Sequence, residues 1–510
     1  MREQHHEKIH VTTWFSCLLP ALLSGLLSSL SGAEYHLSAL GDDARDGLTP
    51  ETAWQSLSRA STARYRPGDC LVLRAGDRFA GSLHLGQGGD AQQPVVVTSS
   101  AGGRATIASG NGETGVMLDA GHVTLRGFDL SGPGATAAPS GDGIHLRCAT
   151  AGQRVAGVVL SDLRVSGFPG HGIRLSADGA GAGVDDLLVE HCRASANGEG
   201  GMGSWGPCAQ GVWAHHRIVV RECCFHDNRG IPSKNTNHSG NGIILGDVQD
   251  AVIEQCRAWG NGADCTFTGG GPVGIWLCEA DRSVIRACVS HHNHTGTQSV
   301  DGGGFDLDGG CTRCVITGCL SWRNDGAGYL LCQYQGAREL RGNQIRDCWS
   351  VGDGRAHGYA GLHLWCDPAG SVHDCLVTAC TLVMDATPQG SACIRWSTPA
   401  DAVRVENSAM VALGGAWLVR GIGQPGCSVA GNHWFAHGDA RAAREDQTPA
   451  EVPGAVEQLR DAWVIPDQID LAWLKRLAGV VATGASGASV QASWGDVLAF
   501  GASAASAGKQ

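Results

Sequence analysis

Residues 252–277 read VIEQCRAWGNGADCTFTGGGPVGIWL, and variants of this stretch recur along the chain. Its first part places an aliphatic residue three positions before a cysteine and an asparagine five positions after it, as in Ile253, Cys256 and Asn261. Equivalent cysteines follow at intervals of 29 to 33 residues. A fixed period of this length predicts stacked coils in which equivalent side chains lie above one another. The repeated cysteines are Cys192, Cys223, Cys256, Cys288, Cys319, Cys348 and Cys380.

The second part of the repeat is a Gly-apolar-x-apolar pattern, as in Gly274-Ile275-Trp276-Leu277 and Gly304-Phe305-Asp306-Leu307. Alternation with period two is typical of strands, and no sustained helical periodicity occurs between about residues 90 and 435. This excludes a helical-repeat solenoid, and the period is too short for a propeller blade. We therefore predict an all-β fold, a parallel β-helix of about ten to twelve coils with short helical caps.

Composition divides the chain into five segments. Residues 1–33 are predicted to be a signal peptide, because the apolar run 14–30 precedes the small-x-small triplet at 31–33; an uncleaved anchor is the alternative. Residues 34–67 should form an N-terminal cap, 68–437 the β-helix, and 438–481 a partly helical C-terminal cap with helices near 456–459 and 469–477. The Ala/Gly/Ser-rich residues 482–510 predict a flexible tail. We expect a secreted protein, periplasmic or extracellular, with no transmembrane segment in the mature chain.

Short motifs near the start carry a family resemblance. The runs Tyr35-His36-Leu37-Ser38, Gly41-Asp42-Asp43, Ala53-Trp54, Pro67-Gly68-Asp69 and Phe79-x-Gly81 resemble the beginning of secreted right-handed parallel β-helix proteins of the pectate-lyase-like superfamily. The resemblance extends over most of residues 34–437. It implies the fold strongly and the reaction weakly, because that superfamily contains lyases, glycosidases, epimerases and non-catalytic members.

The net charge and the cysteine content limit the classes of partner and the disulfides that we expect. The net charge is −12 and no basic stripe is present, which disfavours nucleic-acid binding. Twenty cysteines follow the predicted signal peptide, and those of the repeat should pack as buried, reduced thiols. The better candidates for disulfides lie outside the repeat, namely Cys208, Cys265, Cys311 and Cys314. The sequence does not set the oligomeric state.

Alternation also assigns an outward face. In each Gly-apolar-x-apolar strand, the two apolar side chains point inward and the side chain between them points outward. Because the coils stack, these outward side chains form a column along the rod. The predicted column is His145, Arg174, Trp213, Ile244, Trp276, Asp306, Leu330, His363 and Arg395, and a second column two residues on contains Arg147, Ser176, Gly246, Cys278, Asp308, Cys332 and Trp365. Long loops are predicted to wall a groove over these strands, at 198–211, 229–241, 262–273 and 294–303.

Asp306 and Asp308 are the leading candidates for catalysis. At positions i and i+2 of a strand they share a face about 6.6 Å apart, a separation that suits glycosidase carboxylates. His363 or Lys234 could act as the base of a β-elimination, and His238 is a further candidate for that proton transfer.

Other residues of the same groove are candidates for binding. Trp276 and Trp365 could stack on sugar rings, with Arg395 and His238 contacting the substrate. If the reaction is a calcium-dependent elimination, Asp306, Asp308, Asp301 and Glu279 are the predicted oxygen ligands of Ca²⁺.

These features predict a carbohydrate-active protein that acts on a polysaccharide along the β-helix, as a glycoside hydrolase or a lyase. The paired acids favour hydrolysis, and the superfamily's best-known members favour elimination. A non-catalytic polysaccharide-binding or cell-surface matrix protein is the alternative.

Overall fold

The structure is a computed structural model that describes residues 32–367, 370–397, 400–421 and 427–438. Short pieces at 441–443, 456–458, 465, 472–473 and 475–476 complete the described part. The predicted signal peptide, apart from its last two residues, and the predicted tail lie outside it. Among the described residues, no helix is long and apolar enough to cross a membrane.

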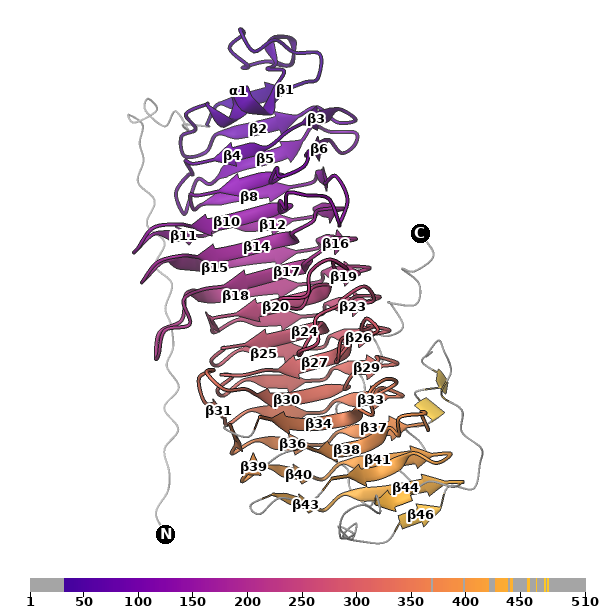
Figure 1. The fold of residues 1–510 in the computed structure, drawn as a ribbon. Helices are drawn as coiled ribbons and strands as arrows, with labels where there is room; N and C mark the ends of the chain where they lie inside the picture. Colours follow the sequence, from indigo (N-terminus) through magenta and orange to yellow (C-terminus); the bar gives the residue numbers. More distant parts are fainter. Residues whose placement is uncertain are drawn as a thin grey trace, which may run out of the picture.

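The chain winds into a rod of about 11 stacked coils with three long parallel sheets along its sides (Figure 1). Each coil contributes one strand to each sheet, and each strand pairs in parallel with its equivalents in the neighbouring coils. The parallel β-helix predicted from the sequence is thereby confirmed. The chain passes from sheet 1 to sheet 2 to sheet 3 in every coil.

Sheet 1 contains sixteen strands. They are β1 (Glu34–Leu37), β2 (Cys70–Leu73), β5 (Val95–Ser99), β8 (Val123–Arg126), β12 (Val159–Ser161), β15 (Gly183–Glu190), β18 (His215–Arg221), β22 (Val252–Glu254), β25 (Val284–Arg286), β28 (Val315–Thr317), β32 (Gln344–Arg346), β36 (Leu376–Thr378), β40 (Arg404–Glu406) and β43 (Ser428–Ala430), with β11 (Arg154–Ala156) and β21 (Val248–Gln249) at the side. A small separate sheet joins β31 (Leu340–Arg341), β35 (Val372–His373) and β39 (Ala400–Asp401).

Sheets 2 and 3 contain 14 and 13 strands. Sheet 2 is β3 (Arg78–Ala80), β6 (Thr106–Ala108), β9 (Asp129–Ser131), β13 (Arg164–Ser166), β16 (Arg193–Ser195), β19 (Cys224–His226), β23 (Arg257–Trp259), β26 (Val289–His291), β29 (Leu320–Trp322), β33 (Trp349–Val351), β37 (Thr381–Met384), β41 (Ala409–Leu413), β44 (His433–His437) and β46 (Val456–Gln458). Sheet 3 is β4 (Leu83–Leu85), β7 (Val116–Leu118), β10 (Ile144–Cys148), β14 (His171–Ala177), β17 (Gly200–Trp205), β20 (Asn241–Gly246), β24 (Val273–Cys278), β27 (Gly303–Leu307), β30 (Tyr329–Gln333), β34 (Ala360–Cys366), β38 (Ala392–Trp396), β42 (Trp417–Arg420) and β45 (Arg441–Ala443).

Two short helices lie at the N-terminal end of the rod. These are the short 3-10 helix η1 (Pro50–Thr52) and the α-helix α1 (Leu57–Ser61). The hydroxyl of Ser56 accepts a hydrogen bond from the backbone N–H of Arg59 and so caps the N-terminus of α1. Buried Leu57 packs into the rod's core, so α1 helps to close this end.

A ladder of buried amides holds the bends between sheets 2 and 3. Each repeat asparagine accepts hydrogen bonds from the backbone N–H and side-chain amide of its equivalent in the preceding coil, as Asn261 does from Asn228 at 3.1 and 2.9 Å. The ladder runs Asn197, Asn228, Asn261, Asn293, Asn324 and Asp353. Because each rung satisfies polar groups of the next coil, the ladder fixes the stacking register.

The repeat cysteines form a second ladder. The Sγ atom of Cys288, for example, lies 3.4 Å from the backbone N of Cys256, and Cys319 lies at the same distance from the N of Cys288. All twenty cysteines of the described residues are free thiols. The buried, reduced ladder is as predicted, whereas Cys208, Cys265, Cys311 and Cys314 form no disulfide.

Two local predictions are wrong. Residues 456–458 form strand β46, which pairs with β44, because the rod continues there instead of being capped by a helix. In the third outward position, Gly203 of β17 replaces Trp213, which lies in the loop between β17 and β18. Residues 200–205 hold few apolar side chains, so the repeat pattern is weak there, and the long loop predicted at 198–211 contains this strand.

Candidate functional site

One outward column of sheet 3 brings polar and aromatic side chains together. The strand register sets Trp276 beside Asp306, Asp306 beside Leu330, Leu330 beside His363, and His363 beside Arg395. Neighbouring strands lie about 4.8 Å apart, so these five residues span about 19 Å of the rod. This part of the column is as predicted.

The second column lies two residues further along the same strands. It places Asp308 on the face that Asp306 occupies, while Phe305 and Leu307 point into the core and are fully buried. Cys332 and Trp365, from β30 and β34, are register neighbours in this column. The two aspartates therefore face out of the rod, toward the loops above sheet 3.

Loops 260–272, 292–302 and 352–359 cover these columns and enclose a cavity of about 760 Å³, which we call the acid cavity. They contribute Phe267, Val300 and Tyr359, among others, to its wall. Of the ten residues predicted for the site, eight line this cavity. These are His238, Trp276, Asp301, Asp306, Asp308, His363, Trp365 and Arg395.

Asp306 lies on the floor of the acid cavity and is only 2% exposed, contrary to the exposed position expected from the sequence. Its Oδ1 atom is buried and has no hydrogen-bond partner in the structure. Burial raises the pKa of Asp306 well above its usual range, and the negative charges of Asp308 and Asp301 raise it further. Asp306 is therefore held in its protonated form near neutral pH.

Asp308 is the more acidic member of the pair. Burial raises its pKa to about 6, against the opposing effects of the Gly309 backbone N–H and the thiols of Cys332 and Cys278. Its Oδ1 also lacks a hydrogen-bond partner. Near neutral pH this carboxyl is therefore mainly ionised beside a protonated Asp306, the division of roles that acid–base pairs require.

Asp301 supplies a third carboxyl from loop 292–302. Its Oδ2 accepts a hydrogen bond of 2.6 Å from the backbone N–H of Gly271, and burial raises its pKa to about 7. The hydroxyl of Tyr359 also hydrogen-bonds to it. The backbone of Asp301 has a φ of 92°, which residues with side chains rarely adopt and which is commonest at functional sites.

His363 is buried in the column between Leu330 and Arg395. Its Nε2 lies 2.7 Å from the hydroxyl of Ser397, and its Nδ1 has no hydrogen-bond partner. Burial, with the charges of Arg395 and Arg420, lowers the pKa of His363 well below its usual range, so the imidazole is neutral. Arg395 donates a 2.6 Å hydrogen bond to the carbonyl of Gly358, which holds the guanidinium against loop 352–359.

Aromatic side chains form much of the wall. Trp276 is buried and its ring lies 5.1 Å from that of His238. Trp365, which is 37% exposed, also lines the acid cavity, and Trp205 and Tyr334 pack against the cluster that contains Trp276. Apolar walls with a few convergent polar groups are typical of ligand sites, and aromatic faces suit pyranose rings.

Two predicted site residues lie elsewhere. Lys234 forms an ion pair of 2.6 Å with Glu199 in a neighbouring cavity. The carboxylate of Glu279 lies 3.2 Å from the guanidinium of buried Arg338, which also bonds Asp247 at 2.8 Å. Glu279 therefore belongs to this buried ion cluster and does not line the acid cavity with the other three predicted calcium ligands.

Calcium itself remains a prediction. In the part of the chain that the structure describes, no group of three or more His, Cys, Asp or Glu side chains is arranged to hold a metal ion. Asp301, Asp306 and Asp308 are nonetheless oxygen donors that share the acid cavity. Chelation of the purified protein tests this prediction.

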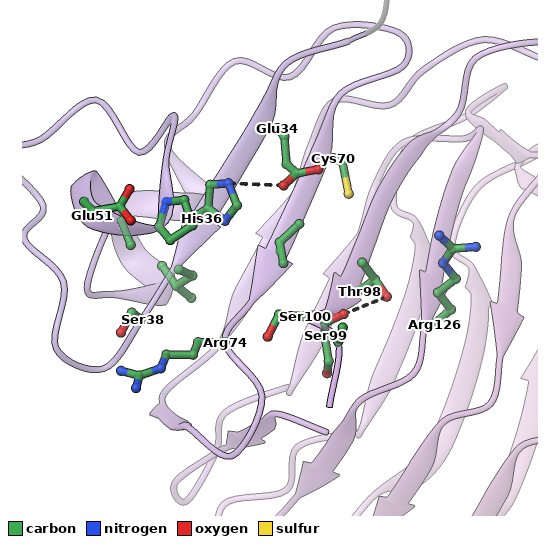
Figure 2. Close-up of a pocket in the computed structure, with 15 residues that line it drawn as sticks. Glu34, His36, Ser38, Glu51, Cys70, Arg74, Thr98, Ser99, Ser100 and Arg126 are labelled. Carbon is green, nitrogen blue, oxygen red and sulfur yellow. Dashed lines mark hydrogen bonds and ion pairs between the residues drawn. The ribbon is translucent and has the colours of Figure 1, made fainter. Parts of the chain in front are cut away.

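A separate hollow of about 600 Å³ lies at the N-terminal end, on the outer face of β1, β2, β5 and β8 (Figure 2). Arg74 and Arg126 lie on either side of the stretch Thr98–Ser100, and His36 is 3.2 Å from Glu34. The charged side chains here are largely in solvent, unlike those of the acid cavity. This hollow lies on a different sheet and contains no pair of buried carboxyls.

The repeat pattern of the sequence did not predict several residues of the acid cavity. Phe267, Tyr359 and His357 come from loops, where no periodicity indicates direction. Trp205 belongs to the strand whose register was misassigned. The unusual backbone of Asp301 has no sequence signal beyond the glycines that follow it.

The comparisons with known proteins agree with this architecture. The family described as the right handed beta helix region matches residues 142–345 and 233–398, which together make up about half of the chain. The chain therefore belongs to the right-handed β-helix family. No protein with a curated description matches the sequence.

Solved structures with the same fold include a GH136 lacto-N-biosidase from Eubacterium ramulus. It is 15% identical, the match covers 78% of this chain and 67% of that chain, and the TM-score is 0.57. The pectate lyase Pel9A is 14% identical over 74% of this chain and 78% of its own, with a TM-score of 0.43. At 15% identity, the likeness to the lacto-N-biosidase shows the fold and does not identify the reaction.

Proposed function

We propose that the protein is a secreted glycoside hydrolase that binds a neutral polysaccharide in the acid cavity. The observation that carries this proposal is the pair Asp306, in β27, and Asp308, directly after β27, which line the same cavity. Each has a buried carboxylate oxygen without a hydrogen-bond partner, in a cavity walled by tryptophan and tyrosine. Groups left unpaired and buried are costly, so a bound ligand would compensate for them.

The protonation states of the two carboxyls give them different roles in hydrolysis. Asp306, kept protonated by burial, donates its proton to the glycosidic oxygen as the bond from that oxygen to the anomeric carbon breaks. Asp308, ionised above a pKa of about 6, takes the proton of the water that adds to the anomeric carbon, or attacks this carbon itself. The spacing of about 6.6 Å expected for positions i and i+2 of a strand lies at the lower end of the range of about 6.5–9.5 Å typical of the route in which water attacks.

Charge supports a neutral substrate. Three carboxyls, those of Asp301, Asp306 and Asp308, line the acid cavity, whereas Arg395 is the single Lys or Arg among the described residues around it. A uronate would bring further negative charge into a buried, acidic site, which is unfavourable unless a cation accompanies it. A neutral sugar carries no such cost.

One observation favours β-elimination as the second candidate. The neutral His363 has an unbonded Nδ1 and lies next to Arg395 in the register. Such a pair could remove the C5 proton of a uronate and neutralise its carboxylate. This route would need a bound cation to offset the ionised carboxyls of the cavity.

Product analysis on a panel of polysaccharides distinguishes the candidates. We expect reducing ends to form from a neutral polymer such as xylan, mannan, galactan or β-glucan, with no absorbance from an unsaturated product and no effect of EDTA. Unsaturated products from polygalacturonate or alginate, abolished by EDTA, would establish elimination instead. Glycan binding without either product would establish a non-catalytic binding protein.

A further inference from the structure

A second cavity, of about 210 Å³, adjoins the acid cavity. The two share Trp205, Asn237 and His238 in their walls. Ile244, which lines the second cavity, is the register neighbour of Trp276 in the first. The two cavities therefore follow one another along sheet 3, and the second, which we call the lysine cavity after Lys234, lies toward the N-terminal end.

The lysine cavity contains matched charges. The ammonium of Lys234 donates a 2.6 Å hydrogen bond to Glu199, and Arg174 lies 3.5 Å from Asp142 at its edge. Each cation is thus balanced by a carboxylate, while spare donors and acceptors remain. Charge-assisted hydrogen bonds from such groups are short and strong, and sugar hydroxyls can both donate and accept them.

His171 adds an unpaired polar atom to the lysine cavity. Its ring lies over β17, where a Cβ on Gly203 would meet His171 Nε2 at 2.5 Å, so glycine is required there. Its Nδ1 is buried, has no hydrogen-bond partner and lies 4.0 Å from the Oδ1 of Asp142. Burial lowers the pKa of His171 to about 3, so the ring is neutral. A buried nitrogen without a partner is costly, and a ligand hydroxyl that reached it would supply one.

We propose that the lysine cavity is a second sugar-binding subsite, which takes a neutral ring of the same chain that occupies the acid cavity. This rests on the proposed function. Lys234 and Glu199 hydrogen-bond the hydroxyls of that ring, and the chain crosses Trp205, which lines both cavities. Lys234 is then a binding residue and not the base predicted from the sequence, since its ammonium bonds Glu199 in a different cavity from Asp306.

The test measures affinity as a function of chain length. The probes are xylo-, cello-, manno- and galacto-oligosaccharides, from the disaccharide upward, titrated by calorimetry against Asp306→Asn to prevent cleavage. Lys234→Met and the near-isosteric Glu199→Gln are added to this background. Lys475→Met, which removes an exposed lysine far along the sequence, is the matched control. Thermal melting confirms that each variant is folded.

We expect affinity to rise at the length that reaches the lysine cavity, and expect Lys234→Met and Glu199→Gln to remove that rise, about tenfold, without affecting shorter chains. Equal losses at every length, no loss, or no binding by any series would each overturn the subsite. The proposed function fails separately, if wild-type protein releases no reducing ends or if Asp306→Asn keeps full turnover. If Asp306→Asn keeps full turnover, the subsite is tested instead by the dependence of KM on chain length in the active Lys234→Met variant.

Discussion

Replacing Asn261 by alanine tests whether the amide ladder holds the rod together. Asn261 is buried, and its side chain makes four hydrogen bonds. It accepts from the backbone N–H and the amide of Asn228, and donates to the Phe225 carbonyl at 3.1 Å and to Asn293 at 2.9 Å. At about 1 kcal/mol net for each bond, Asn261→Ala should lower the free energy of unfolding by about 4 kcal/mol.

Urea unfolding followed by circular dichroism measures this change. Because each coil rests on its neighbours, the loss should also lower the unfolding midpoint of the adjoining coils and appear as an earlier transition. Asn111→Ala, at an exposed loop position, is the matched control and should change stability by less than about 0.5 kcal/mol. A loss below about 1 kcal/mol for Asn261→Ala would refute the idea that the ladder fixes the register.

Two further predictions concern the acid cavity and the buried ion cluster of Arg338, Asp247 and Glu279. The pH profile of kcat/KM should be bell-shaped. The rate should fall as the pH drops below about 6, because Asp308 gains a proton, and it should fall again as the pH rises through the elevated pKa of Asp306, because the proton donor is lost. A rate that is flat across this range would contradict the assignment. Arg338→Met should lower the free energy of unfolding in urea by about 3–5 kcal/mol, because it leaves two buried carboxylates unpaired. The control Arg341→Met, at an exposed position, should lower it little. Similar losses in both variants would contradict the role of this ion cluster.

The sequence predicts most of the fold because its signals are local and repeated. Ile275 and Leu277 alternate with Trp276, and one such strand determines the direction of its equivalents once the coils stack. The same reasoning failed at Gly200–Trp205, where glycines replace the apolar residues and the pattern loses its register. It also failed at Val456–Gln458, where a three-residue strand resembles the start of a helix.

The direction of the site's side chains was predictable only for those on or next to strands, although the loop residues His238 and Asp301 were also candidates. Asp306, Asp308 and His363 follow from counting along the repeat, because strand direction is fixed by alternation. Their burial does not follow from it, since it depends on how loops 260–272, 292–302 and 352–359 fold over sheet 3. Glu279 shows the same limit, because its partner Arg338 is 59 residues away in the sequence.

The reaction of Asp306→Asn with a neutral polysaccharide tests the central claim most directly. Asparagine keeps the shape of the side chain and cannot donate the proton, so kcat/KM should fall by about 10²–10⁴-fold while the melting temperature stays close to that of the wild type. The control Asp250→Asn, which removes an exposed carboxylate on the far side of the coil, should keep full activity. Wild-type turnover by folded Asp306→Asn would contradict the account.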